Sequence, residues 1–244
     1  MKKHLSVFLL MVRSSFYPIL WRLVLLAAVQ GGIFWLVLRG STGEGLLLEN
    51  VVASSRLGLV FGLFFFRVSH FLIRTGRLPG SCQGYTLGRL GISERWVFLW
   101  QAVYNCLMYA LFYMAECLIV LGLGQIYIHH APAEYVTGQT VFLALYRSPL
   151  LHSLLPMEDG LAWLRNIVLL LSLGICAAQY PMGTRRGKRA KAFVFLMAMV
   201  PTFFVQPLGS SPMYVFQMIF CLFFVAFCLY KALMPEEVED DEET

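Results

Sequence analysis

The chain has 244 residues, of which 59% are hydrophobic and 14% are charged, with a formal net charge of +5 and a mean hydropathy of +0.70. A soluble domain of this length would carry about 25% charged residues. The composition therefore excludes an ordinary soluble domain and indicates an all-α, polytopic integral membrane protein.

The N-terminal stretch, MKKHLSVFLLMVRSS, combines a basic start with a short apolar core that ends at Arg13. No small-residue cleavage site follows, which argues against a signal peptide. We expect instead an amphipathic helix that lies on the inner membrane surface. This helix should turn at Ser14–Pro18 into the first membrane span.

Six apolar runs are long enough, or nearly so, to cross a hydrocarbon core about 30 Å thick. They cover residues 19–38, 57–73, 97–128, 161–179, 192–206 and 213–230. The third is too long for one perpendicular crossing, so it tilts, breaks near Gly122 or Gly124, or extends beyond the bilayer. The fifth is short and contains Pro201, which predicts a kink or a half-buried segment. Residues 1–234 then form one membrane domain, followed by a tail at 235–244.

Arginine and lysine are distributed unevenly among the connections. If the N-terminus is cytoplasmic, the inner segments hold fourteen of these residues and the outer segments three, which places both termini in the cytoplasm. The tail PEEVEDDEET carries seven acids, so the rest of the chain has a net charge of +12. This basic face suits the anionic inner leaflet and is no evidence for nucleic acid. The tail either contacts a basic partner or is solvated and disordered.

The longest predicted outer loop, about residues 129–160, contains the apolar stretch Thr140–Tyr146, which is too short to cross the membrane. We expect a re-entrant or interfacial helix there. His129, His130 and Glu134 have a ligand-like spacing, but Pro132 interrupts any helix through them. We therefore expect no metal site.

Motifs for chemistry are absent from the sequence. It contains no HExxH, no GxSxG and no paired aspartates within the spans. The six cysteines form no CxxC pair, so we expect them to act as small apolar side chains in the membrane core. These features predict a protein that is not an enzyme and binds no cofactor directly.

Ionisable groups inside spans are costly, so each is a functional hypothesis. Arg67 lies in the inner half of the second span, at the depth that Tyr104 and Asn105 reach in the third. Glu116 and Arg165 lie higher and at comparable heights, which suggests an ion pair. Such residues either line a substrate path or hold helices together within the subunit. The candidate polar network comprises Arg67, His70, Tyr104, Asn105, Glu116 and Arg165.

Between the second and third spans, the stretch YTLGRLGISERW at residues 85–96 carries apolar residues that are not needed for crossing. Leu87 and Leu90 share one side of a short helix. Ser93 can cap the next helix, with Glu94 at its positive end, and Trp96 marks the membrane interface. We therefore expect a short cytoplasmic surface helix that docks another molecule.

The surface helix, six spans and a short helix in the first cytoplasmic loop together resemble the plan of type-2 ABC transporter permeases. The stretch YTLGRLGISERWVFLWQAVYN is similar to small permeases of Gram-positive gut bacteria. The resemblance implies that the loop helix fits a groove on a cytoplasmic ATPase and transmits its closure to the spans. The matching positions are Tyr85, Thr86, Leu87, Arg89, Leu90, Ile92, Ser93, Glu94 and Arg95.

The resemblance further implies a half-transporter in a bacterial plasma membrane, with export as the family's tendency. Two such chains, identical or related, would enclose the path, and ATP and Mg would bind to separate ATPase subunits. The alternatives are an autonomous carrier or channel, a non-transporting scaffold, or an enzyme of unrecognised type. The aromatic-rich interior is compatible with a peptide, a lipid or an amphipathic drug, so the substrate stays open.

Overall fold

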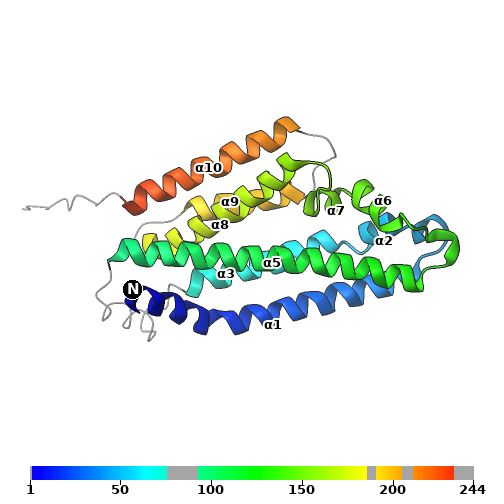
Figure 1. Cartoon of the computed structure of the whole chain (residues 1–244), viewed down its shortest axis with the longest axis horizontal. Helices are drawn as coiled ribbons and strands as arrows, with labels where there is room; N and C mark the ends of the chain where they lie inside the picture. The colour runs from blue at the N-terminus through cyan, green and yellow to red at the C-terminus, as the bar shows by residue number, and fades with distance from the viewer. Residues whose placement is uncertain (1, 76–92, 186–190, 205–210, 234–244) are drawn as a thin grey trace, which may run out of the picture.

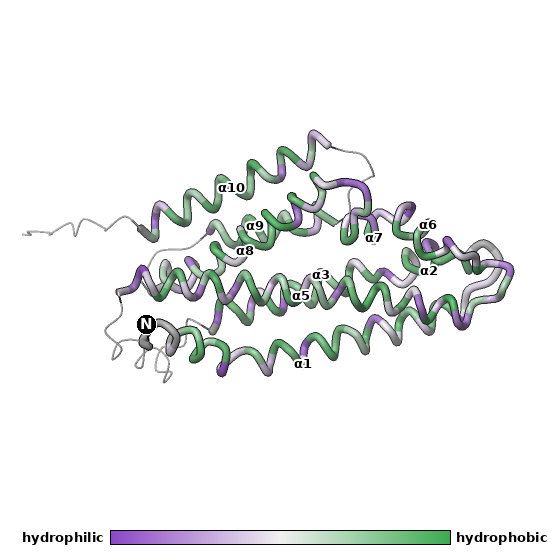
Figure 2. Tube along the Cα trace, viewed as in Figure 1, coloured by the Kyte–Doolittle hydropathy of each residue, from purple (hydrophilic) through white to green (hydrophobic). Residues whose placement is uncertain are grey.

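The computed structural model describes residues 2–75, 93–185, 191–204 and 211–233, and within these ranges the chain is helical and contains no strand. Five helices are long and apolar enough to cross a membrane. They are α1 (Lys2–Gly40), α3 (Leu57–Thr75), α5 (Glu94–His130), α8 (Gly160–Arg185) and α10 (Ser211–Leu233). Hydrophobic residues dominate along the length of α10 (Figure 2). The predicted class, an α-helical membrane protein, is confirmed.

The predicted fifth span is α9 (Lys191–Phe204), which has 14 residues and contains Pro201. At 1.5 Å per residue it is about 21 Å long, less than the hydrocarbon thickness of about 30 Å. Its first turn lies near the end of α8, where the rings of Phe193 and Tyr180 are 5.9 Å apart. At its other end, the Phe204 carbonyl accepts a hydrogen bond from the Ser153 hydroxyl at 3.2 Å. Helix α9 thus runs back along the bundle without reaching full span length.

The expected turn at Ser14–Pro18 is wrong, because α1 is one helix of 39 residues with Pro18 inside it. Proline removes one backbone donor, but membrane helices tolerate this loss where nearby side chains bond the backbone. Around Pro18 the hydroxyls of Ser14 and Ser15 donate to the Met11 carbonyl at 2.9 and 2.6 Å, and the Arg22 guanidinium donates to the Pro18 carbonyl at 2.9 Å. None of these bonds reaches the Ser14 carbonyl, the acceptor that loses its backbone donor to the proline. The N-terminal segment therefore continues directly into the first span.

Helix α5 is continuous over 37 residues and does not break at Gly122 or Gly124. Its length of about 56 Å exceeds the membrane core, so tilting or extension beyond the bilayer accounts for the excess. Helix α5 packs against both α8 and α1, α10 packs on α8, and α3 packs on α1. The central helix α5 therefore connects the two sides of the bundle.

The long helices run side by side, and the start of α1 and the end of α10 lie at the same end of the bundle (Figure 1). The end of α3 and the start of α5 lie at this end as well. We call it the terminal end. The two helix ends that flank residues 76–92 therefore lie at the same end of the bundle as the start of α1 and the end of α10.

Short helices gather at the opposite end of the bundle (Figure 1). They are η1 (Gly43–Leu46), α2 (Leu48–Ser54), η2 (Ala133–Tyr135), α6 (Thr140–Arg147) and α7 (Pro149–Leu154). Helix α6 coincides with the apolar stretch expected to be helical, so that part of the prediction is confirmed. It packs against both α2 and α7.

The closest approach between α5 and α8 occurs at Gly174. A Cβ atom placed there would lie 2.8 Å from the backbone nitrogen of Cys106 and 2.9 Å from its Cα. Both atoms belong to the backbone of α5 and cannot rotate away. A small residue at this crossing lets the two backbones meet, as is common where membrane helices pack.

Candidate functional site

Two polar side chains of α5 are buried near its terminal end and bind different neighbouring helices. The hydroxyls of Tyr104 and Ser15 are 2.7 Å apart and link α5 to α1. The amide of Asn105 donates to the Gly174 carbonyl of α8 at 3.4 Å. Both side chains are therefore satisfied within the subunit.

Glu116 is buried farther along α5 and binds α1. Its Oε1 accepts a hydrogen bond of 2.8 Å from the Gln30 amide, and its side chain is 1% exposed. The second carboxyl oxygen and the Gln30 Oε1 have no hydrogen-bond partner within the described residues. The expected ion pair of Glu116 with Arg165 is wrong, since Glu116 faces α1 whereas Arg165 faces α7, α9 and α10.

Arg165 is the largest fully buried side chain within the described ranges, with 0% exposure. Its Nε and Nη2 donate to Asn166 Oδ1 at 3.2 and 2.9 Å, and Nη2 also reaches the Ser153 carbonyl at 3.5 Å. Its Cζ lies 4.5 Å from the ring centre of Tyr214 and 5.6 Å from that of Phe203. Aromatic faces stabilise a cation in this position.

Asn166 extends this arrangement toward α5. Its amide donates to the Tyr113 hydroxyl at 3.0 Å and to the Ser153 carbonyl at 2.8 Å. The Tyr113 hydroxyl in turn donates to the Leu154 carbonyl. We call Arg165, Asn166, Tyr113 and Ser153 the Arg165 cluster. It joins α5, α7 and α8, and the only hydrogen-bonding atom of Arg165 that it leaves without a partner, within the described residues, is Nη1.

Arg67 and His70 lie elsewhere, on the outer surface of α3, where both side chains are exposed. Tyr104 and Asn105, the predicted partners of Arg67, are engaged with Ser15 and Gly174. The structure therefore does not bring the six predicted residues into one network. It separates an interior set, bonded between helices, from a charged pair on the surface.

The predicted coupling segment is described only at its end. Tyr85, Thr86, Leu87, Arg89, Leu90 and Ile92 lie outside the described residues, whereas Ser93, Glu94 and Arg95 are exposed at the start of α5. Ser93 occupies the N-cap position, as predicted, but its side chain makes no capping hydrogen bond. Glu94 lies in the first turn, where a negative charge favours the helix.

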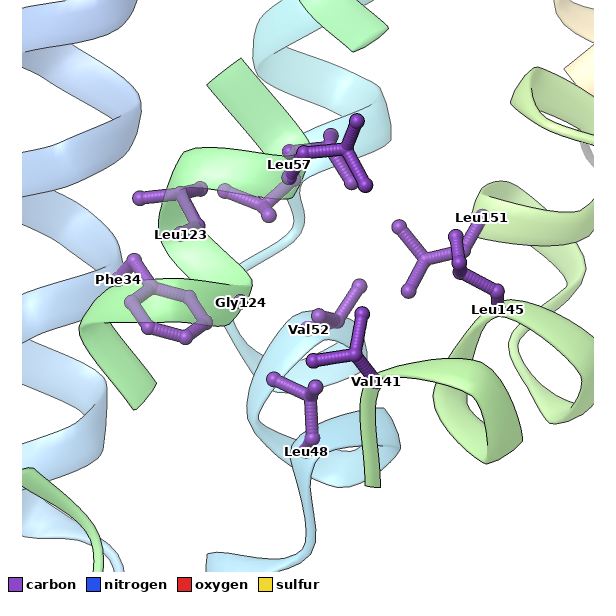
Figure 3. Close-up of a pocket in the computed structure, with 11 residues that line it drawn as sticks. Phe34, Leu48, Val52, Leu57, Leu123, Gly124, Val141, Leu145 and Leu151 are labelled. Atoms are coloured by element: carbon purple, nitrogen blue, oxygen red, sulfur yellow. The ribbon is translucent and has the colours of Figure 1, made fainter. Parts of the chain in front are cut away.

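Sequence reasoning missed an apolar pocket between the bundle and the short helices. The pocket is small and has room for about one water molecule. Figure 3 shows that its walls come from distant parts of the chain, which include α1, α2, α5 and α6. The lining residues are Phe34, Leu48, Val52, Leu57, Val120, Leu121, Leu123, Gly124, Val141, Leu145 and Leu151. The pocket offers hydrocarbon contacts and no polar side chain.

Sequence spacing also missed a contact between two thiols. The Sγ atoms of Cys176 in α8 and Cys228 in α10 lie 3.5 Å apart, and both residues are fully buried. The described ranges contain no group of three or more histidines, cysteines or acids that could hold a metal ion. The thiol pair is a contact between α8 and α10.

Most of these interior polar contacts join neighbouring helices of the bundle. No protein-family model matches the chain, and comparisons with curated proteins and with solved structures find no match.

Proposed function

We propose that the chain is the membrane-spanning permease subunit of an ABC transporter, which works with a second permease chain and is driven by a separate cytoplasmic ATPase. The observation that supports this proposal most is the position of the two helix ends that flank residues 76–92. The end of α3 and the start of α5 both lie at the terminal end, together with the start of α1 and the end of α10 (Figure 1). That end is the cytoplasmic one if the distribution of arginine and lysine sets the orientation.

The helix that follows this segment suits a coupling role. Helix α5 starts at Glu94 and continues unbroken to His130, packing against α8 and α1 along the way. A force applied at residues 85–95 would therefore act on one stiff helix in contact with both sides of the bundle. In the proposed mechanism, ATP binding and hydrolysis in the partner bias the permease between inward- and outward-open states.

The described end of the coupling segment lies at the surface of the bundle. Ser93 and Arg95 are exposed at the beginning of α5 and are accessible to a partner. The Arg165 cluster and the Glu116–Gln30 pair lie within the bundle and hold its helices together. We therefore assign coupling to residues 85–95 and helix association to the interior polar groups.

The experiment is to tag the C-terminus, extract the protein in a mild lipid-like detergent and identify co-purifying chains by mass spectrometry. We expect a stoichiometric ATP-binding subunit with the wild-type protein and its loss with Leu90→Glu. The matched control is Lys191→Glu, which changes an exposed charge at the start of α9 and should retain the subunit. Equal recovery of the ATPase with both variants, or its absence from the wild type, would contradict the proposal.

A further inference from the structure

We propose that Arg22, Arg67 and Arg74 form a binding site for the phosphate headgroup of an anionic phospholipid. The site lies on the outward face of α1 and α3 near the terminal end. It follows from the membrane fold and does not require the permease role. Its first element is a stripe on α3, where Arg67, His70 and Arg74 follow one another at intervals of three and four residues and are all exposed.

The second element is Arg22, which reaches across from α1. Its Cζ lies 4.2 Å from the ring centre of Phe71 on α3, and its Nη1 donates to the Pro18 carbonyl at 2.9 Å. These contacts fix the guanidinium beside the α3 stripe. There it is close enough to Arg67 for the two positive charges to interact.

The third element is the lack of a counter-charge among the described residues. The ion pair found there is Arg147 with Glu49, at the other end of the bundle, so none of the three arginines is paired with a described carboxylate. Like charges held together at a membrane surface repel unless an anion lies between them. A phosphate provides several acceptor oxygens, and guanidinium groups bind such oxygens in a forked geometry.

The level of the site in the membrane identifies the phosphate as that of a lipid. Tyr17 and Trp21 precede Arg22 and are 75% and 63% exposed. Exposed tyrosine and tryptophan mark the headgroup level of membrane proteins. Arg67 lies eight residues before the end of α3, about 12 Å along the helix, and a long arginine side chain can extend from there toward the interface. The site therefore opens toward lipid headgroups.

The test is native mass spectrometry of the full chain in mild detergent, titrated separately with phosphatidylglycerol, phosphatidylcholine and inorganic phosphate. The test variant is the double change Arg22→Gln and Arg67→Gln. The matched control is Arg39→Gln, because Arg39 also lies over an aromatic ring, with its Cζ 4.6 Å from the centre of Trp35, but at the other end of α1. A further variant, Arg22→Lys with Arg67→Lys, keeps both charges.

We expect the wild type to prefer phosphatidylglycerol to phosphatidylcholine. The glutamine double variant should bind phosphatidylglycerol about 25-fold more weakly, at about fivefold per arginine. Arg39→Gln should stay within about twofold of the wild type, and the lysine variant should retain most of the affinity. A melting curve for each variant separates lost binding from lost folding.

Three results would overturn the proposal. One is equal phosphatidylglycerol binding by the glutamine variant and the wild type. Another is equal affinity of the wild type for the two lipids. The third is displacement of bound phosphatidylglycerol by an equimolar amount of inorganic phosphate, which would assign the site to a soluble anion instead. If the glutamine variant melts early, the lysine variant replaces it in the comparison. Loss of phosphatidylglycerol binding by a folded lysine variant, which keeps both charges, would then contradict the proposal.

Discussion

Arg165 and Arg67 both lie within helices of membrane-spanning length, yet their surroundings differ completely. Arg165 is fully buried, bonded to Asn166 and the Ser153 carbonyl, and flanked by the rings of Tyr214 and Phe203. Arg67 is exposed on α3, beside Arg22 and without an ion-pair partner in the described part of the chain. Described side chains and a backbone carbonyl surround the first charge, whereas the second faces outward from the bundle.

The contrast between Arg165 and Arg67 separates polar groups that hold helices together from polar groups that can bind another molecule. Polar groups that bind each other between helices stabilise one subunit, and their loss should lower its stability wherever it is measured. Polar groups that face outward should matter little for the isolated fold and more for what the fold binds. The following predictions test that separation, beginning with the largest expected effect.

Replacing Gly174 by valine should destabilise the protein most. The new side chain would meet the backbone of Cys106, so α5 and α8 must separate, at a cost of about 3 kcal/mol. The melting temperature in mild detergent measures the effect. Gly122→Val is the control, because nothing lies within 4 Å of a Cβ at Gly122 in α5. Similar melting of the two variants would contradict the close crossing.

Replacing Arg165 by methionine should cost about 2 kcal/mol, because Asn166 and the Ser153 carbonyl lose a charged donor. Thermal unfolding in the same detergent provides the measurement. Arg67→Met removes an equal charge from the surface and should change the free energy of unfolding by less than about 0.5 kcal/mol. A larger loss for Arg67→Met than for Arg165→Met would reverse the comparison above.

Replacing Gln30 by leucine should have a smaller effect, about 0.6 kcal/mol, the average for a hydrogen bond between membrane helices. The change leaves the buried carboxyl of Glu116 without its donor. Gln125→Leu, at an exposed position of α5, controls for the change in side-chain type. If the two leucine variants unfold at the same temperature, the hydrogen bond between Gln30 and Glu116 does not stabilise the packing of α1 on α5.

Glu49→Gln should have the smallest effect. It removes the ion pair with Arg147, whose atoms are 3.3 Å apart and whose arginine side chain is 61% exposed. Exposed ion pairs contribute little, here on the order of 0.3 kcal/mol, and weaken with salt. Unfolding measured at low and high salt should therefore show a small difference that disappears at high salt. A difference that persists in salt would indicate a more buried pair.

Much of the fold follows from the sequence, because long apolar runs have few alternatives to a membrane helix. The runs at 57–73 and 213–230 correspond closely to α3 and α10. The stretch Thr140–Tyr146 is helical as predicted. The fifth run is short, as expected, and falls below full span length. The predicted turn at Ser14–Pro18 is wrong, since α1 continues through Pro18 as one helix.

The pairing of side chains was less predictable. Depth along a helix can be estimated from residue number, but the direction in which a side chain points depends on how each helix is rotated against its neighbours. Residue number predicts a similar depth for Glu116 and Arg165, yet Glu116 faces α1 and Arg165 faces α10. The contact between Cys176 and Cys228 joins two helices and leaves no trace in local spacing. Only the three-dimensional packing identifies such partners.

The central claim is that the segment between α3 and α5 lies with both termini in the cytoplasm, where an ATPase could reach it. The most direct measurement is fluorescence from a reporter that folds only in the cytoplasm, fused in turn to the N-terminus and to the C-terminus in a bacterial host. We predict fluorescence from both fusions. With five helices of span length, this result requires α9 to cross the membrane as the sixth. Fluorescence from the N-terminal fusion alone would show an odd number of crossings and contradict the account.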